Sequence, residues 1–278
     1  MMRIDAHQHC WQLAARQGSW PPPSLAAIYR DFAPADLAPL LAEHGVDGTV
    51  LVQSMPLEAD TDWMLALAAR TDFIRAVVGW TDLLAQDAPE RIARLAAQPL
   101  LKGLRPMLQD LDDDAWIADA RLAPALQAMM AHGLRFDALV LPRHLPALLQ
   151  MARAYPALPI VIDHAAKPPI LDAAFGHWRE DLALLGALPN VYCKMSGMVT
   201  EAKPAWRVDD LLPYVSHVLA VFGPQRVIWG SDWPVVNLAG GYSAWLAASE
   251  TLLAHLSEED RECIFGQNAV QFYALEKE

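Results

Sequence analysis

Two histidines near the start of the chain, His7 and His9 in the stretch MMRIDAHQHCW, have types and a spacing that could do chemistry. Side chains two positions apart on a β-strand point to the same face, so both imidazoles should point the same way. Asp5 would then lie below them, and the alternate residues would face the surrounding helices. Imidazoles transfer protons, bind divalent metals and donate hydrogen bonds to a developing oxyanion. The pair is therefore a candidate catalytic site.

Two more polar residues follow apolar runs, Asp232 in WGSDWP and His164 in IVIDHAAKP. An aspartate in this position can cap the next helix. Pro234 and the neighbouring Trp229 and Trp233 favour a shaped pocket instead, where a carboxylate beside imidazoles serves as a general base or a metal ligand. Asp163 and His164 should point to opposite faces. We expect His164 to enter the site and Asp163 to bond to the backbone or to a helix outside it.

Other residues at the ends of apolar runs could bind a substrate. Arg105 in KGLRP offers a fork of donors for a carbonyl or carboxylate oxygen. Lys194 in VYCKMSG stands inside an apolar stretch, where its charge needs a partner or an anionic ligand. The remaining candidates for the rim of the site are Gln53 and three tryptophans, Trp11, Trp20 and Trp80.

The elements that must position these residues alternate regularly along the chain. Short β-rich runs end in a polar residue, and amphipathic Ala/Leu-rich segments lie between them. We predict strands within 3–7, 48–54, 73–80, 100–106, 134–140, 159–164, 191–197 and 226–232, and helices that include 33–45, 87–98, 122–133, 145–156 and 211–223.

Eight strand–helix repeats in a chain of this length predict an α/β fold, a single-domain (β/α)8 barrel over residues 1–278. The polar strand ends would meet at the mouth of this barrel. A doubly wound open sheet is the alternative, but it would usually carry a Gly-rich phosphate turn after an early strand, and the sequence has none.

Composition excludes several classes of protein. The net charge of −12 argues against a nucleic-acid or anionic-membrane partner, which would need a basic patch. No run of about 18 apolar residues predicts a membrane span, and the N-terminus does not resemble a signal peptide. Three scattered cysteines favour reduced thiols in a cytoplasmic protein over a disulfide framework. The oligomeric state cannot be read from the sequence.

The ordered motifs resemble those of the amidohydrolase superfamily, and in particular its lactonase branch. That branch includes sugar-acid lactonases and 2-pyrone-4,6-dicarboxylate lactonase. The resemblance runs along the whole chain to GQNAVQFY at 266–273, and it implies an amidohydrolase-like barrel. It is carried by DAHQHCW, KGLRP, DHAAKP, CKMSG and WGSDWP.

The sequence departs from the metal-rich members of that superfamily. The run 134–140 has no histidine at its end, and Lys102 precedes the end of the fourth run, so a closed binuclear centre is not expected. His7, His9 and Asp232 could hold one zinc with an open position. We expect catalysis with no obligatory metal.

The resemblance implies a hydrolase of carbohydrate catabolism that opens a sugar-derived lactone to the hydroxy acid. Asp232 would act as the general base for water, and His7, His9 and His164 would assist at the developing oxyanion. Because Arg105 is nearly the sole arginine at a strand end, we expect a neutral, L-fuconolactone-like 1,4- or 1,5-lactone. The alternatives are a zinc-dependent decarboxylase or amidohydrolase of the same superfamily and a catalytically silent ligand-binding barrel.

Overall fold

The computed structural model describes residues 2–16 and 18–275. Its strands form one parallel sheet of eight, paired in sequence order. The strands are β1 (Ile4–Gln8), β2 (Gly48–Val52), β3 (Ile74–Gly79), β4 (Leu101–Leu104), β5 (Arg135–Ala138), β6 (Ile160–Ile162), β7 (Val191–Met195) and β8 (Val227–Trp229). The helices are α1 (Pro34–His44), α2 (Glu58–Ala68), α3 (Ala88–Ala96), α4 (Ala123–Ala131), α5 (Leu145–Ala154), α6 (Trp178–Gly186), α7 (Val208–Phe222), α8 (Tyr242–Leu252), α9 (Glu258–Glu262) and α10 (Asn268–Phe272).

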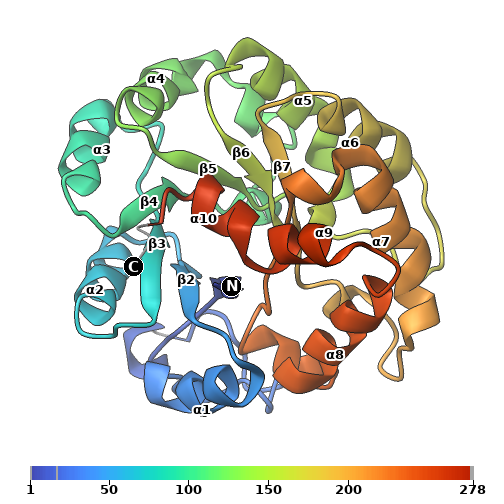
Figure 1. The fold of residues 1–278 in the computed structure, drawn as a ribbon. Coiled ribbons are helices and arrows are strands. Elements are labelled where there is room, and N and C mark those ends of the chain that lie inside the picture. The colour runs from blue at the N-terminus through green and yellow to red at the C-terminus, as the bar shows by residue number, and fades with distance from the viewer. Residues whose placement is uncertain (1, 17, 276–278) are drawn as a thin grey trace.

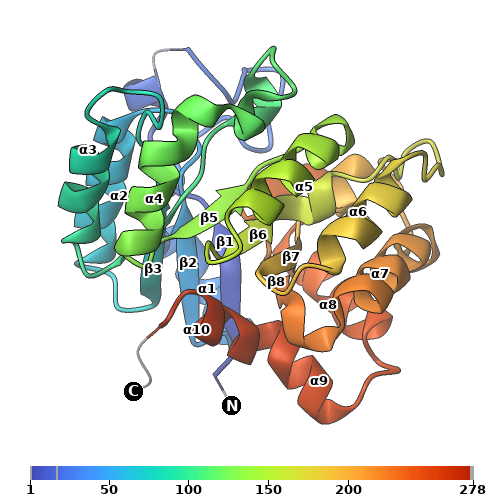
Figure 2. The same ribbon diagram turned by 90° about the horizontal axis from the view of Figure 1, so that it is seen from above.

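Helices α1 to α8 surround the sheet in chain order (Figures 1 and 2). Every predicted β-rich run contains a strand, and the five quoted helical stretches coincide with α1, α3, α4, α5 and α7. The predicted (β/α)8 barrel is therefore confirmed. The pattern could be read from the sequence because buried parallel strands are short apolar runs, whereas the helices between them are amphipathic.

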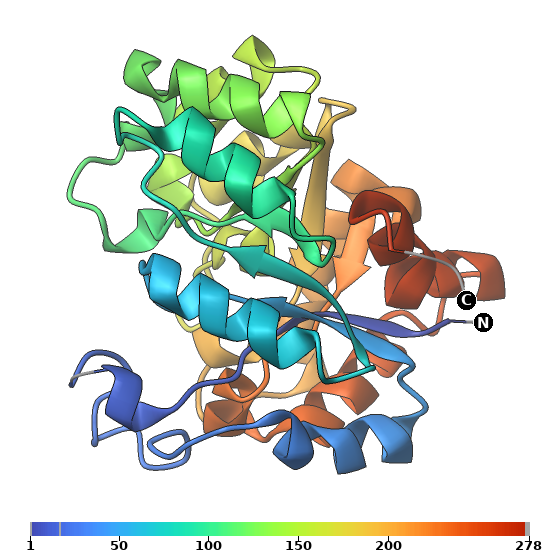
Figure 3. The same cartoon turned by 90° about the vertical axis from the view of Figure 1, so that its left-hand side faces the viewer.

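The two ends of the barrel differ. Both termini lie at the end where the strands begin, and α10 crosses that end (Figures 1 and 3). Phe272 at its end and the next residue, Tyr273, join an apolar cluster inside the barrel that includes Val50, Ala76 and Ile228. The loop between β1 and α1 lies at the opposite end (Figure 3). One end is therefore closed by apolar packing, and the other carries the βα loops.

An irregularity in β1 changes which of its residues face inward. Asp5 and Gln8 lie three residues apart, but their partners on β2 lie only two apart, which is the signature of a β-bulge. Before the bulge, Ile4 and Ala6 pack inside the barrel and Asp5 faces outward. After it, His7 faces inward. The expectation that Asp5 shares a face with the histidines was wrong, because the bulge interrupts the alternation.

Within residues 2–16 and 18–275, no helix combines the length and the apolar character that crossing a bilayer requires.

Candidate active site

A cavity of about 420 Å³ opens at the carboxyl ends of the strands. This is where (β/α)8 barrels carry their catalytic groups. Four of its titratable lining residues are almost fully buried: His9, Arg105, His164 and Asp232. A hollow of about 460 Å³ beside Arg3 at the other end of the barrel is lined by none of these groups.

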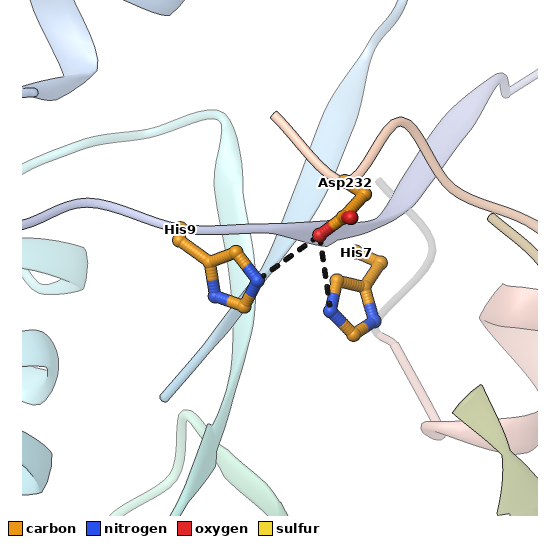
Figure 4. Close-up of side chains that lie close together, drawn as sticks. All are labelled: His7, His9 and Asp232. Atoms are coloured by element: carbon orange, nitrogen blue, oxygen red, sulfur yellow. Dashed lines mark hydrogen bonds and ion pairs between the residues drawn. The ribbon is translucent and has the colours of Figure 1, made fainter. Parts of the chain in front are cut away.

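His7, His9 and Asp232 converge on one point (Figure 4). Oδ1 of Asp232 lies 3.3 Å from Nε2 of His9 and 3.8 Å from Nε2 of His7. Closure of the barrel brings them together, since the backbone N–H of His9 donates to Trp233 O at 2.7 Å and that of Asp232 donates to His7 O at 2.8 Å. The residues predicted from opposite ends of the chain therefore form a single centre.

The protonation of His9 follows from its hydrogen bonds. Its Nδ1 lies 2.7 Å from the carbonyl oxygen of Val52, which can only accept, so Nδ1 carries a proton. In a neutral ring Nε2 then has a lone pair, which faces the carboxylate of Asp232 at 3.3 Å. Two acceptors in this arrangement need a proton or a cation between them. His9 and Asp232 are thus suited to share a proton or to bind a metal ion.

A donor set for one divalent ion is present. One ligand atom from each of His7, His9 and Asp232 can be chosen so that all lie within 4.8 Å of one another. Nδ1 of His7 lies 3.5 Å from Oδ1 of Asp163. A carboxylate that accepts from Nδ1–H leaves the Nε2 lone pair free for a metal. The three residues therefore fit a single ion with an open position.

Burial sets the charges of this centre. It lowers the pKa of His7 well below its ordinary value, with the Lys194 charge acting in the same direction, and it lowers the pKa of His164 to about 4. Burial alone would raise the pKa of Asp232, but the interactions with His164 and His9 outweigh it and lower that pKa. At neutral pH the centre consists of an ionised Asp232 beside neutral His7 and His164.

The position of His164 depends on an unusual backbone. His164 and the next three residues, up to Lys167, have φ values of 54°, 49°, 60° and 50°, and none is glycine. Left-handed conformations cost other residues roughly 1–2 kcal/mol each and gather at functional sites. Nδ1 of His164 lies 2.9 Å from Ser196 Oγ, and a Cβ on Gly197 would lie 2.5 Å from the same nitrogen. The turn and this close contact fix the ring.

Asp163 also points into the barrel. Its Oδ1 lies 3.0 Å from Lys194 Nζ, and its Oδ2 accepts a hydrogen bond from Arg105 at 3.3 Å. The expectation that Asp163 would lie outside was wrong. Strand β6 ends at Ile162, and the left-handed turn at His164 removes the alternation on which that expectation rested.

Lys194 lies behind the centre. It is fully buried, and its Nζ lies 2.6 Å from Asp137 and 3.2 Å from Nδ1 of His7. Tyr273 donates to the same Asp137 oxygen at 2.6 Å. Burial raises the pKa of Asp137, and the Lys194 charge opposes this shift. Lys194 does not line the cavity, so the structure gives no support to its predicted contact with substrate.

Arg105 lies between the cavity and this buried network. Its Nη1 approaches His7 Nε2 at 3.4 Å, and its Nη2 donates to the backbone oxygen of Gln53. The Gln53 amide in turn donates to Arg105 O at 2.6 Å. Arg105 lines the cavity as predicted. Gln53 does not line it and instead forms hydrogen bonds with Arg105.

The three candidate tryptophans have different positions. Trp20 lines the cavity. Trp11 is buried and packs edge-to-face against Trp20, with ring centroids 5.3 Å apart. Trp80 is not among the lining residues, and its backbone is hydrogen-bonded to Thr61. Only Trp20 is therefore placed to contact a ligand directly.

The sequence interpretation missed part of the cavity wall. Glu201 follows β7, and its carboxylate lies 3.8 Å from the ammonium of Lys167, which also lines the cavity. Burial raises the pKa of Glu201. These residues lie several positions beyond the strand ends, where strand alternation no longer predicts direction. The wall also includes Gln109, Asp110 and Thr200.

The barrel and its buried histidine–aspartate centre together are typical of a (β/α)8-barrel enzyme. The same centre joins the first strand to the segment after the last, so the whole chain is needed to form it. The chain matches the Amidohydrolase family over residues 4–275 and belongs to that family.

Two similar proteins carry the name L-fucono-1,5-lactonase. The one from Burkholderia ambifaria is 56% identical over 99% of this chain and 96% of its own length. The one from Burkholderia multivorans is 36% identical over the same shares. A crystal structure of a Burkholderia multivorans amidohydrolase with bound zinc is similar with a TM-score of 0.93 and 36% identity, covering 99% of this chain and 100% of that one. The predicted superfamily and lactonase resemblance are confirmed.

Proposed function

We propose that this protein hydrolyses L-fucono-1,5-lactone or a closely related sugar lactone to the open hydroxy acid. The observation that carries the proposal is the convergence of Asp232, His9 and His164 on one cavity, with His7 beside Asp232, in a chain that matches an L-fucono-1,5-lactonase over nearly its whole length. The reaction adds water to the ring ester and breaks the bond between the carbonyl carbon and the ring oxygen.

Asp232 is the general base. Its carboxylate is ionised at neutral pH and lies at the cavity surface, so it can take a proton from a water molecule that attacks the lactone carbonyl. The same proton can return to the alkoxide that leaves the ring. Because an alkoxide is a better leaving group than the nitrogen anion of an amide, a lactone needs less electrophilic assistance than an amide.

Arg105 and His164 stabilise the charge that develops on the carbonyl oxygen. Arg105 and His164 both line the cavity, and each can present an N–H to that oxygen. Removing one such donor typically costs about 3 kcal/mol of transition-state stabilisation. Asp163 acts indirectly by fixing the ring of His7, and Lys194 acts by holding Asp163.

His7, His9 and Asp232 can hold one divalent ion, which would supply Lewis-acid polarisation and an activated water. The tautomer of His9 imposed by Val52 supports this, since it leaves Nε2 free to coordinate. Metal content after purification and zinc titration of the apoprotein measure this capacity, and His9→Ala should abolish it. We predict that catalysis needs no metal. The rate measured after chelation tests this, and an unchanged rate in the metal-free protein is expected.

The charges around the cavity favour a neutral substrate. Two cations and three carboxylates line it, which disfavours a lactone with several carboxylates of its own. All three cysteines are free, in keeping with an action in the cytoplasm and in carbohydrate catabolism. The charged lining residues are Arg105, Lys167, Asp110, Glu201 and Asp232.

Acid release from L-fucono-1,5-lactone, corrected for spontaneous opening, tests the proposal. The wild-type protein should accelerate the reaction, and Asp232→Asn should lower kcat/KM by about 10²- to 10⁴-fold, as expected for loss of a general base. Asp62→Asn, an exposed carboxylate on α2, is the matched control and should retain activity. Near-normal turnover by Asp232→Asn would refute the role of Asp232, and no acceleration by the wild type would refute the function.

A further inference from the structure

We propose that Lys167 and Glu201 form a specificity-determining pair that recognises adjacent hydroxyl groups on the lactone ring. The inference rests on the proposed lactonase function and deepens it, because it assigns recognition of the polyol to residues other than the reacting centre.

The two side chains form an accessible ion pair on the cavity wall. Nζ of Lys167 lies 3.8 Å from Oε1 of Glu201, and their side chains are 24% and 29% exposed. Both line the same cavity as His164 and Asp232. Within the described part of the chain, neither side chain has a hydrogen bond or ion pair with Asp232 or a histidine of the centre. The pair therefore faces the ligand space from the wall and not from the reacting centre.

The backbone of the chain is shaped to present Lys167. It is the last residue of the left-handed run that begins at His164, and its N–H donates to His164 O at 2.8 Å. The indole of Trp178 donates to Ala165 O at 2.7 Å and supports the turn from outside. One strained segment thus positions both a catalytic histidine and the lysine, which is the arrangement expected where strain serves a site.

Glu201 is positioned by the neighbouring loop. Its backbone oxygen accepts a hydrogen bond at 2.9 Å from the N–H of Leu171, so the loops after β6 and β7 are tied together beside the cavity. The separation of Lys167 from Glu201 is therefore set by the backbone of both loops.

The chemistry of the pair matches a vicinal diol. A carboxylate has two oxygens and can accept from two neighbouring hydroxyl groups, while an ammonium donates to their oxygens. Hydrogen bonds to charged groups are stronger than those between neutral groups. Because the two charges cancel, the pair favours a neutral polyol and adds no net attraction for an anion.

The test compares two lactones of the same ring size. L-fucono-1,5-lactone carries ring hydroxyl groups, and δ-valerolactone carries none. The variants are Lys167→Met, Glu201→Gln and the double variant, each with a melting temperature to confirm folding. Lys203→Met is the matched control, since Lys203 is paired with Asp210 at 3.0 Å and does not line the cavity.

Each single variant should lower kcat/KM for L-fucono-1,5-lactone by about ten- to hundredfold, the loss expected for charged hydrogen bonds. The loss should appear in KM, and the double variant should lose little more than either single variant. Turnover of δ-valerolactone should be nearly unchanged, and Lys203→Met should behave as the wild type. If the wild type opens δ-valerolactone too slowly to measure, L-fucono-1,5-lactone alone tests the inference: a raised KM with kcat nearly unchanged supports recognition of the hydroxyl groups by the pair.

Three results would overturn the inference: a fall in kcat with KM unchanged, an equal loss on both lactones, or variants that match the wild type. A wild type that opens neither lactone would instead refute the lactonase function itself, so the two failures are distinguishable.

Discussion

Replacing Lys194 by Met would remove one of two cations that face a pair of buried carboxylates. Lys194 and Arg105 are opposed by Asp137 and Asp163, and the ammonium lies 2.6 Å and 3.0 Å from their oxygens. All three of Lys194, Asp137 and Asp163 are fully buried. Breaking such a pair typically costs about 3–5 kcal/mol, because a buried charge is left uncompensated. This is a large part of the roughly 5–15 kcal/mol that stabilises most domains.

Urea unfolding followed by circular dichroism measures this loss, which should lower the midpoint by about 1 M or more. Without the ammonium, the folded-state pKa values of Asp137 and Asp163 rise. A carboxyl group whose folded pKa exceeds its unfolded value stabilises the fold less as pH rises, so the variant should regain stability relative to the wild type as the pH is lowered. The double variant Lys194→Met/Asp137→Asn restores the charge balance and should recover most of the loss.

A Lys194→Met protein within about 1 kcal/mol of the wild type, or a double variant no more stable than the single one, would refute this reasoning. The double variant also tests the role predicted from the sequence. Direct contact with substrate predicts a raised KM, whereas orientation of His7 from behind predicts a lower kcat with KM nearly unchanged.

Three further predictions concern the surrounding groups. Because burial lowers the pKa of His164 to about 4, kcat/KM should stay level at neutral pH and fall only as the pH approaches that value; a pH–rate profile with a limb near the ordinary histidine pKa would contradict this. Gly197→Ala adds a Cβ 2.5 Å from His164 Nδ1 at a residue with φ of 59°, so it should cost at least about 1–2 kcal/mol in thermal unfolding and also lower kcat. Asp5 has its pKa raised by burial from 3.8 to about 6, which corresponds to about 3 kcal/mol, so wild-type stability should fall as pH rises through about 4 to 6. Asp5→Asn should flatten that slope, and an unchanged slope would assign it to other groups.

The sequence predicted which two ends of the chain meet, because His7 and His9 stand at the end of β1 and Asp232 closely follows β8. In a closed barrel the first and last strands are neighbours, so these three side chains converge. The alternation of inward- and outward-facing side chains along a strand gave the wrong direction at two places. The bulge reversed the direction of Asp5, and the left-handed turn after β6 let Asp163 and His164 both point inward. Neither feature has a glycine or proline signal at those positions.

The sequence also could not predict how the buried charge of Lys194 is compensated. Lys194 was recognised as a lysine that needed a partner, but its partners Asp137 and Asp163 come from β5 and from the turn after β6. Residues with large sequence separation meet only when the barrel closes, and a polar residue at an apolar strand end can face the cavity or a buried network equally well. The cavity wall at Glu201 and Lys167 depended in the same way on loop paths.

The sequence by itself determined the barrel, the end of the barrel that does the chemistry, and the family. Hydrophobic periodicity fixes the elements, and parallel closure fixes which strand ends meet. Only the tertiary structure decided which polar side chains reach the cavity and which compensate one another behind it. That choice depends on local φ/ψ values, on one bulge and on electrostatic pairing across strands. None of these features produces a repeating pattern of residue types that can be recognised in the sequence.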